Sequence, residues 1–294
     1  MLNAYPDYYP QFSCIADRCR HNCCIGWEID VDENTLASYH RIGGEMGERL
    51  RRSISEDGDA PHFLLGEHER CPFLNGKNLC DLILYGGDKL LCQICTDHPR
   101  YRSFFSERTE IGVGLCCEEA ARLILTKPDR TTLVVTGEGT LDEEETALLA
   151  LRDRFFAAAQ EREKPIFQRV ERFLSLCGAS LPDIPLTQWA EFYLSLERMD
   201  EQWTELLRAL RSHADELPLS DFAAHMNGRE TEYEQLLVYF LYRHVPAALD
   251  DGDVSSKAAF AAASVQLLFA LGALHEKKHG SFTVSDQIEL CHLY

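Results

Sequence analysis

The chain has 294 residues, of which 45% are apolar and 26% are charged, a composition typical of soluble globular proteins with one large domain or two modest ones. Its formal net charge is −19, which argues against a nucleic-acid partner, because such a partner needs a concentrated basic surface. Residues 1–126 carry 13 Lys and Arg against 20 Asp and Glu, and the rest carries 16 against 28, so neither part is basic.

The N-terminal segment MLNAYPDYYPQFSC lacks the basic region and apolar stretch of a secretory signal. We therefore expect a cytoplasmic protein with reduced thiols. Ten of its 12 cysteines lie within the first 117 residues. A chain of this length can bury an ordinary core without covalent staples, so clustered thiols favour a metal or cluster site. In a secreted chain they would instead form five or six disulfides.

Residues 1–126 read as short helices among loops. Asp32 can cap a helix over ENTLASYHRI, which Gly43–Gly44 interrupts, and GERLRRSI forms a second helical segment. From residue 71 to 101 the sequence predicts turns and loops around cysteines. The segment ERTEIGVGL favours a short strand, and EEAARLIL, at residues 118–125, predicts a compact helix.

Residues 127–294 read as helices. Two apolar stripes have the i, i+3, i+4, i+7 spacing of a buried helix face; they comprise Trp189, Phe192, Tyr193, Leu196, Met199, Trp203, Leu206, Leu207 and Leu210, then Tyr233, Leu236, Leu237, Phe240 and Leu241. Residues 258–274 are nearly all apolar, but Ser264, Gln266 and Gly272 interrupt them, so they predict a buried bundle helix rather than a membrane span. We therefore predict a mainly α protein, with a cysteine-rich loop-and-helix metal-binding domain at 1–126 and an α-helical bundle at 127–294.

The cysteine spacing points to a metal without choosing which one. Thiolates are soft ligands that select zinc, copper(I) and iron–sulfur clusters. Cys14, Cys19, Cys23 and Cys24 fall within eleven residues, and a two-residue spacing between Cys92 and Cys95 lets both reach one metal. Neither two zinc knuckles nor the ferredoxin cysteine run is present. Zinc and an iron–sulfur cluster are therefore equally compatible with the spacing.

Motifs for other cofactors are absent from the sequence. It contains no dinucleotide-binding G-x-G-x-x-G after a strand, no P-loop and no G-x-S-x-G nucleophile elbow. A cofactor would therefore not be held by a Rossmann unit.

Three segments together resemble the flagellin lysine N-methylase family, part of a wider set of zinc- or iron-chelating proteins. They are FSCIADRCRHNCCIGWEIDVDENTLASY, CPFLNGKNLCDLILYGGDKLLCQICTDHPRYRSFF and EIGVGLCCEEAARLIL, within residues 10–126. The resemblance implies methyl transfer from S-adenosylmethionine to lysine side chains of flagellin, with a cysteine-bound [4Fe–4S] cluster. The cysteines that match the family pattern are Cys14, Cys19, Cys23, Cys24, Cys71, Cys80, Cys92, Cys95 and Cys117.

Four further residues are candidates for the chemistry that this resemblance implies. A lysine amine has a pKa of about 10.4, so an enzyme must deprotonate it before it attacks a methyl group. Glu110 and Glu119 match acidic family positions and could orient the ammonium, although each could equally be a solvated or helix-capping acid. Arg100 could clamp the cofactor carboxylate or tie the cysteine loops to Asp97 or a backbone carbonyl. Trp27 could stack on adenine or shield the metal from water.

A second interpretation belongs to a different functional class. The chain could be a metal-stabilised helical binding or adaptor protein, with zinc or an iron–sulfur cluster and no catalysis of its own. Iron content would distinguish the two metals, and the lysine masses of flagellin would test the enzyme. Neither interpretation involves a membrane or a nucleic acid.

Overall fold

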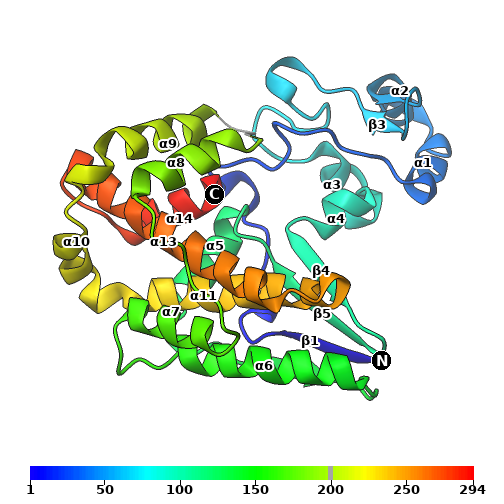
Figure 1. The fold of residues 1–294 in the computed structure, drawn as a ribbon. Coiled ribbons are helices and arrows are strands. Elements are labelled where there is room, and N and C mark those ends of the chain that lie inside the picture. The colour runs from blue at the N-terminus through cyan, green and yellow to red at the C-terminus, as the bar shows by residue number, and fades with distance from the viewer. Residues whose placement is uncertain (198–200) are drawn as a thin grey trace. The chain divides into compact units, whose positions relative to one another are not determined.

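A computed structural model describes residues 1–197 and 201–294 of the protein (Figure 1). The chain forms two compact units, each described by itself below. The cysteine-rich unit is Ser13–Tyr101, and the helical unit combines Met1–Phe12 with Arg102–Tyr294. Composition places a boundary at 126, whereas the cysteine-rich unit ends at 101. The difference arises because residues 102–126 supply a strand that pairs with the N-terminus and a helix that packs in the bundle.

The cysteine-rich unit consists of short elements joined by loops. Asp32 caps its first helix, as its sequence predicts, since its carboxylate accepts a hydrogen bond from the Thr35 amide at 3.0 Å. Its core is small, and two cysteines are buried within it. The elements are α1 (Glu33–His40), α2 (Gly44–Ser53), β2 (Ile54–Ser55), β3 (His62–Phe63), α3 (Asp81–Gly86) and α4 (Gln93–Asp97).

The helical unit contains a four-stranded mixed sheet in the order β4-β5-β1-β6. The strand predicted from ERTEIGVGL is confirmed as β5, which pairs in parallel with β1, so that Ala4 lies opposite Glu110. Strand β6 pairs with the other edge of β1 in antiparallel fashion. The strands are β1 (Leu2–Pro6), β4 (Arg100–Phe104), β5 (Arg108–Val113) and β6 (Leu133–Thr136).

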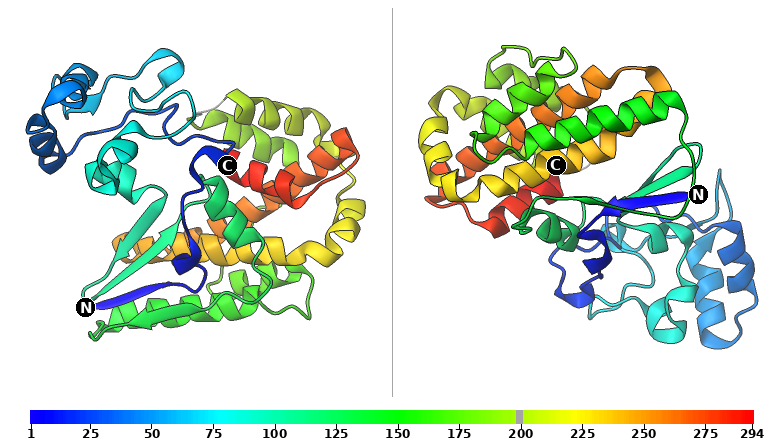
Figure 2. Two further views of the ribbon diagram at one scale, coloured as in Figure 1. Left: turned by 180° about the vertical axis from the view of Figure 1, so that it is seen from behind. Right: turned by 90° about the horizontal axis from the view of Figure 1, so that it is seen from below.

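Helices make up most of the described chain, which confirms the mainly α prediction. Helices α11 and α13 run side by side through the helical unit, and the other helices surround them (Figure 2). The helices of this unit are α5 (Glu118–Leu125), α6 (Glu143–Ala159), α7 (Ile166–Ser175), α8 (Leu186–Ser195), α9 (Glu201–His213), α10 (Leu219–His225), α11 (Glu230–His244), α12 (Ala248–Asp251), α13 (Val254–His279) and α14 (Val284–Leu293).

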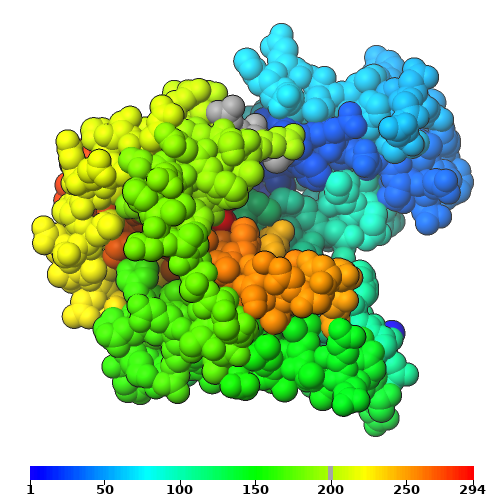
Figure 3. All heavy atoms as spheres, in the orientation of Figure 1, coloured from blue at the N-terminus to red at the C-terminus, as the bar shows by residue number. Residues whose placement is uncertain are grey.

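Helix α13 is the one helix in the described ranges that is long and apolar enough to cross a membrane, and 72% of its apolar window is buried inside the protein. Its polar interruptions are accommodated there. Ser264 donates to the Phe260 carbonyl and accepts from the Tyr294 hydroxyl, while a Cβ on Gly272 would lie 2.8 Å from the Phe222 ring. In Figure 3 the first turns of α13 (orange) reach the surface. These features support the predicted bundle helix.

The apolar stripe predicted from 189 to 210 is only partly buried. It is divided between α8 and α9, and Met199 lies outside the described residues. Leu207 and Leu210 are fully buried, but Phe192 is 52% exposed and Leu196 is 45% exposed. The prediction of a single buried face was therefore wrong for Phe192 and Leu196, because it read one spacing across two separate helices.

His244, at the end of α11, is expected to make the helical unit less stable in acid. Its ring lies 4.7 Å from the Phe260 ring, and burial, with the charges of Arg243 and Lys257, lowers its pKa to about 4. An unfolded histidine has a pKa of about 6.5, so the unfolded state binds the extra proton between these values. We expect the free energy of unfolding to fall as the pH drops from 6.5 to 4. Urea denaturation over this range should show a shallower fall for His244→Asn than for the wild-type protein.

Candidate metal centre in the cysteine-rich unit

Five cysteines approach one another in the cysteine-rich unit, and we call them the thiol group. Cys71 is 6% exposed and Cys92 is fully buried, and the other three pack against the same core. Each member interacts electrostatically with others: Cys24 with Cys71 and Cys80, and Cys95 with Cys24 and Cys71. The thiol group therefore comprises Cys24, Cys71, Cys80, Cys92 and Cys95.

Backbone contacts bring these cysteines together from three separate segments. The Cys71 amide donates to the Cys24 carbonyl at 2.8 Å, which joins the first segment to the second. Cys80 precedes the first turn of α3, and a bridge to Leu74 closes the loop before it. Cys92 precedes the first turn of α4, so the two-residue spacing places Cys95 one turn further on.

Two pairs of neighbouring thiols share hydrogen bonds. The bond with Cys95 lowers the pKa of the Cys92 thiol, and the same bond raises the pKa of Cys95. The bond with Cys24 lowers the pKa of the Cys23 thiol to about 7, while that of Cys24 rises. Burial raises the pKa of the remaining buried member, Cys71, to about 11. Within each pair, therefore, one thiol has a lowered pKa and the other a raised one, and a metal would have to displace the protons of both.

The other four predicted ligands lie outside the thiol group. Cys23 is exposed and adjoins the group through its hydrogen bond with Cys24. Cys14 is exposed, and its sulfur accepts from the Ala16 amide at 3.4 Å. The Cys19 thiol donates to the His21 carbonyl at 2.5 Å. Cys117 belongs to the helical unit, where it precedes the first turn of α5. Spacing alone could not separate these cysteines from the convergent ones, because convergence depends on the intervening turns.

The thiol group suits a zinc or iron–sulfur centre by its donor chemistry, since thiolates are the preferred ligands of both. It also offers at least the four sulfurs that such a centre needs. In the part of the chain that the structure describes, however, no three His, Cys, Asp or Glu side chains are already arranged around a metal position. The five thiols thus share one core without being arranged as a ligand set.

Trp27 and Arg100 both contact the backbone near the thiol group. The Trp27 indole donates to the Cys23 carbonyl at 2.6 Å, and its ring packs against the core that contains the thiols. The Arg100 guanidinium donates to the Thr96 carbonyl at 3.2 Å. The position of Trp27 is compatible with a shielding role, and the contact of Arg100 ties a cysteine loop to a backbone carbonyl. Their role in binding a cofactor stays a prediction.

Glu110 and Glu119 each form an ion pair within the helical unit. Glu110 is 1% exposed and accepts from Arg152 at 2.5 and 2.8 Å and from Arg108 at 2.5 Å. Glu119 accepts two hydrogen bonds from Arg122, both at 2.7 Å. These ion pairs give the carboxylates of Glu110 and Glu119 a structural role. Their predicted catalytic role stays a prediction.

An acidic groove, which the sequence did not indicate, lies within the cysteine-rich unit. This cavity of about 520 Å³ is lined by Asp30, Val31, Asp32, Glu33, Asp59, Ala60, Pro61, Gln93, Ile94 and Asp97. Partial burial opposes ionisation of Asp32, but hydrogen bonds from the Gln93 and Thr35 amides hold its pKa below the ordinary value. The groove therefore keeps negative charge beside the helix that carries Cys95.

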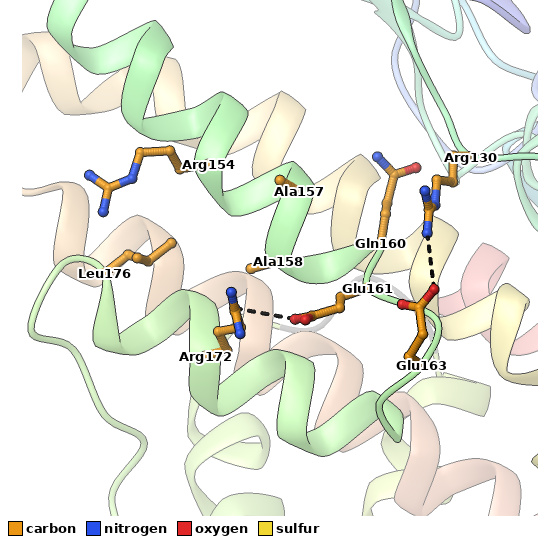
Figure 4. Close-up of a pocket in the computed structure, with 9 residues that line it drawn as sticks. All are labelled: Arg130, Arg154, Ala157, Ala158, Gln160, Glu161, Glu163, Arg172 and Leu176. Atoms are coloured by element: carbon orange, nitrogen blue, oxygen red, sulfur yellow. Dashed lines mark ion pairs between the residues drawn. The ribbon is translucent and has the colours of Figure 1, made fainter.

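A second cavity, of about 580 Å³, lies between α6 and α7 in the helical unit (Figure 4). Its lining includes Arg130, Arg154 and Arg172 together with Glu161 and Glu163, so cationic side chains outnumber anionic ones by one. The Arg172 Nε atom lies 3.2 Å from a Glu161 oxygen, and Arg130 lies 4.0 Å from Glu163. The excess of positive charge does not suit a cationic lysine, and no thiol lines the cavity.

Among curated proteins, the chain is similar to lysine N-methylases, which confirms the resemblance seen in the three sequence segments. It is 28% identical over 136 residues to the "Lysine-N-methylase" of Salmonella typhimurium and, over the same length, to that of Salmonella choleraesuis. It is 27% identical over 136 residues to the "Flagellar biosynthetic protein FliU" of Salmonella muenchen.

These matches cover part of each protein. They span 44% of this chain, 33% of each Salmonella lysine-N-methylase and 79% of the FliU protein. The chain therefore aligns with about a third of the length of the first two relatives. No family model matches the chain, and no solved structure does so.

Proposed function

We propose that the protein is a cytoplasmic methyltransferase that moves methyl groups from S-adenosylmethionine to lysine side chains of flagellin. The observation that carries the proposal is the similarity to proteins named lysine-N-methylase and FliU. The thiol group and the acidic groove support it, because they offer a place for a metal centre and a place for a cationic side chain in the same unit.

We further propose that the thiol group holds a [4Fe–4S] cluster, with zinc as the alternative. Such a cluster supplies a rigid scaffold and, where only three thiolates bind it, an open iron position. The chain contributes the five sulfurs of the thiol group, of which four suffice. Trp27 packs beside them and limits the access of water.

The acidic groove would bind the lysine substrate. Its carboxylates attract an ammonium group, and Asp32 stays ionised because two backbone amides donate to it. For transfer, the Nζ atom must lose one proton and form a bond to the methyl carbon as the bond from that carbon to sulfur breaks. S-adenosylmethionine supplies the methyl group as a sulfonium. The proton that leaves the Nζ atom passes to water.

We expect the acidic groove to determine the KM for flagellin and to have no effect on the metal content of the protein. Combining Asp59→Asn with Glu33→Gln removes two exposed charges, each worth about 0.2–1 kcal/mol of attraction to a cation. We expect the KM for flagellin to rise about 2- to 30-fold while iron or zinc per chain is unchanged. Steady-state methyl transfer and metal analysis of the same preparation test this. Glu48→Gln, on the exposed surface of α2, is the control, and an unchanged KM in the double variant would exclude the groove.

The enzyme itself is tested with the whole chain purified without oxygen. About four iron atoms per chain and absorbance near ~400 nm would support the cluster. A colourless protein with one zinc per chain would instead support the zinc centre. Flagellin from cells with and without this gene would then be compared by mass spectrometry. Lysine masses that rise by whole methyl groups only in the presence of the gene support the enzyme, and identical masses overturn it.

The metal-stabilised binding protein is the second candidate. It is favoured by the burial of Cys71 and Cys92 in the only core that the cysteine-rich unit has among its described residues. In that case metal removal would unfold this unit, and flagellin masses would not depend on the gene.

A further inference from the structure

The hydroxyl of Tyr39 lies between the main chain and a member of the thiol group. We propose that Tyr39 is a positioning residue, which fixes Cys92 for the metal and donates a hydrogen bond to its thiolate. The inference rests on the thiolate centre proposed above, and it applies equally to zinc and to an iron–sulfur cluster. It does not depend on methyl transfer.

The ring of Tyr39 is held firmly by the core of the cysteine-rich unit. Tyr39 lies on α1 and is 2% exposed. Its ring stacks on that of Phe63 with centroids 6.3 Å apart, and Phe63 in turn lies 5.0 Å from Phe73. Since these rings surround it, the phenol cannot swing away without opening the core. The position of the hydroxyl is therefore set by packing.

The hydroxyl oxygen has two neighbours. It lies 2.5 Å from the Leu90 carbonyl, to which it donates, and 3.6 Å from the Cys92 sulfur. A phenol carries one proton and can accept one more. While Cys92 is a thiol, its S–H can donate to the Tyr39 oxygen. Once Cys92 is a thiolate, the phenol proton can turn from the carbonyl toward the charged sulfur, which is the stronger acceptor.

A donor at this position matters because Cys92 is fully buried. Water cannot solvate a thiolate there, so its charge must be balanced by the metal and by nearby donors. Groups that hydrogen-bond a ligand sulfur also orient it and raise the reduction potential of an iron–sulfur centre. Tyr39 meets both requirements, because it links α1 to the turn that carries Cys92 and Cys95.

Tyr39→Phe tests this inference, because it removes the hydroxyl and leaves the ring stacking intact. We expect its affinity for zinc, measured on the whole chain by competition with a chromophoric chelator, to fall about 10-fold or more. If the protein carries iron, we expect a lower midpoint potential in an anaerobic titration followed by electron paramagnetic resonance. Tyr85→Phe is the matched control, since Tyr85 is 57% exposed on α3 of the same unit.

The possible results distinguish a failure of the inference about Tyr39 from a failure of the proposed metal centre. Wild-type zinc affinity in folded Tyr39→Phe would overturn the inference and leave the proposed centre standing. A Tyr39→Phe chain that loses its circular dichroism while Tyr85→Phe keeps it would also overturn it, since the hydroxyl would then serve folding. A wild-type chain that binds neither zinc nor iron would remove the centre, and the inference with it.

Discussion

Replacing both Cys71 and Cys92 with serine is expected to abolish metal binding by the protein, because only three of the five sulfurs of the thiol group remain. Both side chains are buried in the core that the thiol group shares, and a serine hydroxyl is a poor ligand for zinc or for iron–sulfur clusters. We expect iron to fall from about four per chain to below one, or zinc from about one to near zero. Metal analysis and the absorbance near ~400 nm measure this directly.

The controls for this experiment are cysteines that the structure leaves outside the thiol group. Cys14→Ser alters an exposed side chain, and Cys291→Ser alters a buried one in α14 of the helical unit. Both variants should keep the wild-type metal content. Loss of metal in Cys14→Ser would instead extend the ligand set to the first cysteine segment. Full metal content in the Cys71→Ser/Cys92→Ser double variant would refute the proposed centre.

Glu110→Gln is expected to destabilise the helical unit by about 3–5 kcal/mol, because removing one partner of a buried ion pair leaves an uncompensated charge. Glu110 is the acid that both Arg152 and Arg108 contact, and Arg152 is fully buried beside it. Urea denaturation followed by circular dichroism would show the loss as a lower midpoint. The variant keeps the shape of the side chain, so the effect reports charge rather than packing.

Glu119→Gln provides the comparison, because its partner Arg122 is about half exposed. An ion pair of this kind contributes roughly 1 kcal/mol or less. If Glu110→Gln were as stable as the wild type but transferred methyl groups more than about 10-fold more slowly, the carboxylate would be catalytic. If Glu110→Gln instead lost stability while its folded molecules transferred methyl groups at the wild-type rate, the role of Glu110 would be structural.

The helices whose signals are local could be predicted from the sequence. Asp32 precedes α1 as a capping residue, and the segment at 118–125 forms α5 with the predicted bounds. The long apolar stretch around Ser264 became the buried helix α13. In each case a few adjacent residues carry the information, through capping, periodicity or composition.

The sheet could not be predicted in the same way. β5 was foreseen as a strand, but its parallel partner β1 lies about a hundred residues earlier in the chain. Nothing in either segment specifies such a distant pairing. For the same reason the ion pair of Glu110 with Arg152 could not be predicted, because Arg152 comes from α6, far along the sequence.

The sequence predicted the type of candidate site but not which residues come together in it. Clustered cysteines indicated a metal, but spacing alone could not rank the nine family positions. The structure distinguishes them by the turns that carry Cys71, Cys80 and Cys92 to one core. The acidic groove escaped notice because its carboxylates come from segments around Asp32, Asp59 and Asp97.

The pairing of β1 with β5 also has a consequence for the order in which the protein can fold during synthesis. Strand β1 precedes β5 in the chain, and β5 is made only after the whole of Ser13–Tyr101 has been translated. The cysteine-rich unit can therefore be completed while β1 still lacks its parallel partner. Until β5 emerges from the ribosome, the edge of β1 that pairs with it stays open to association with other chains.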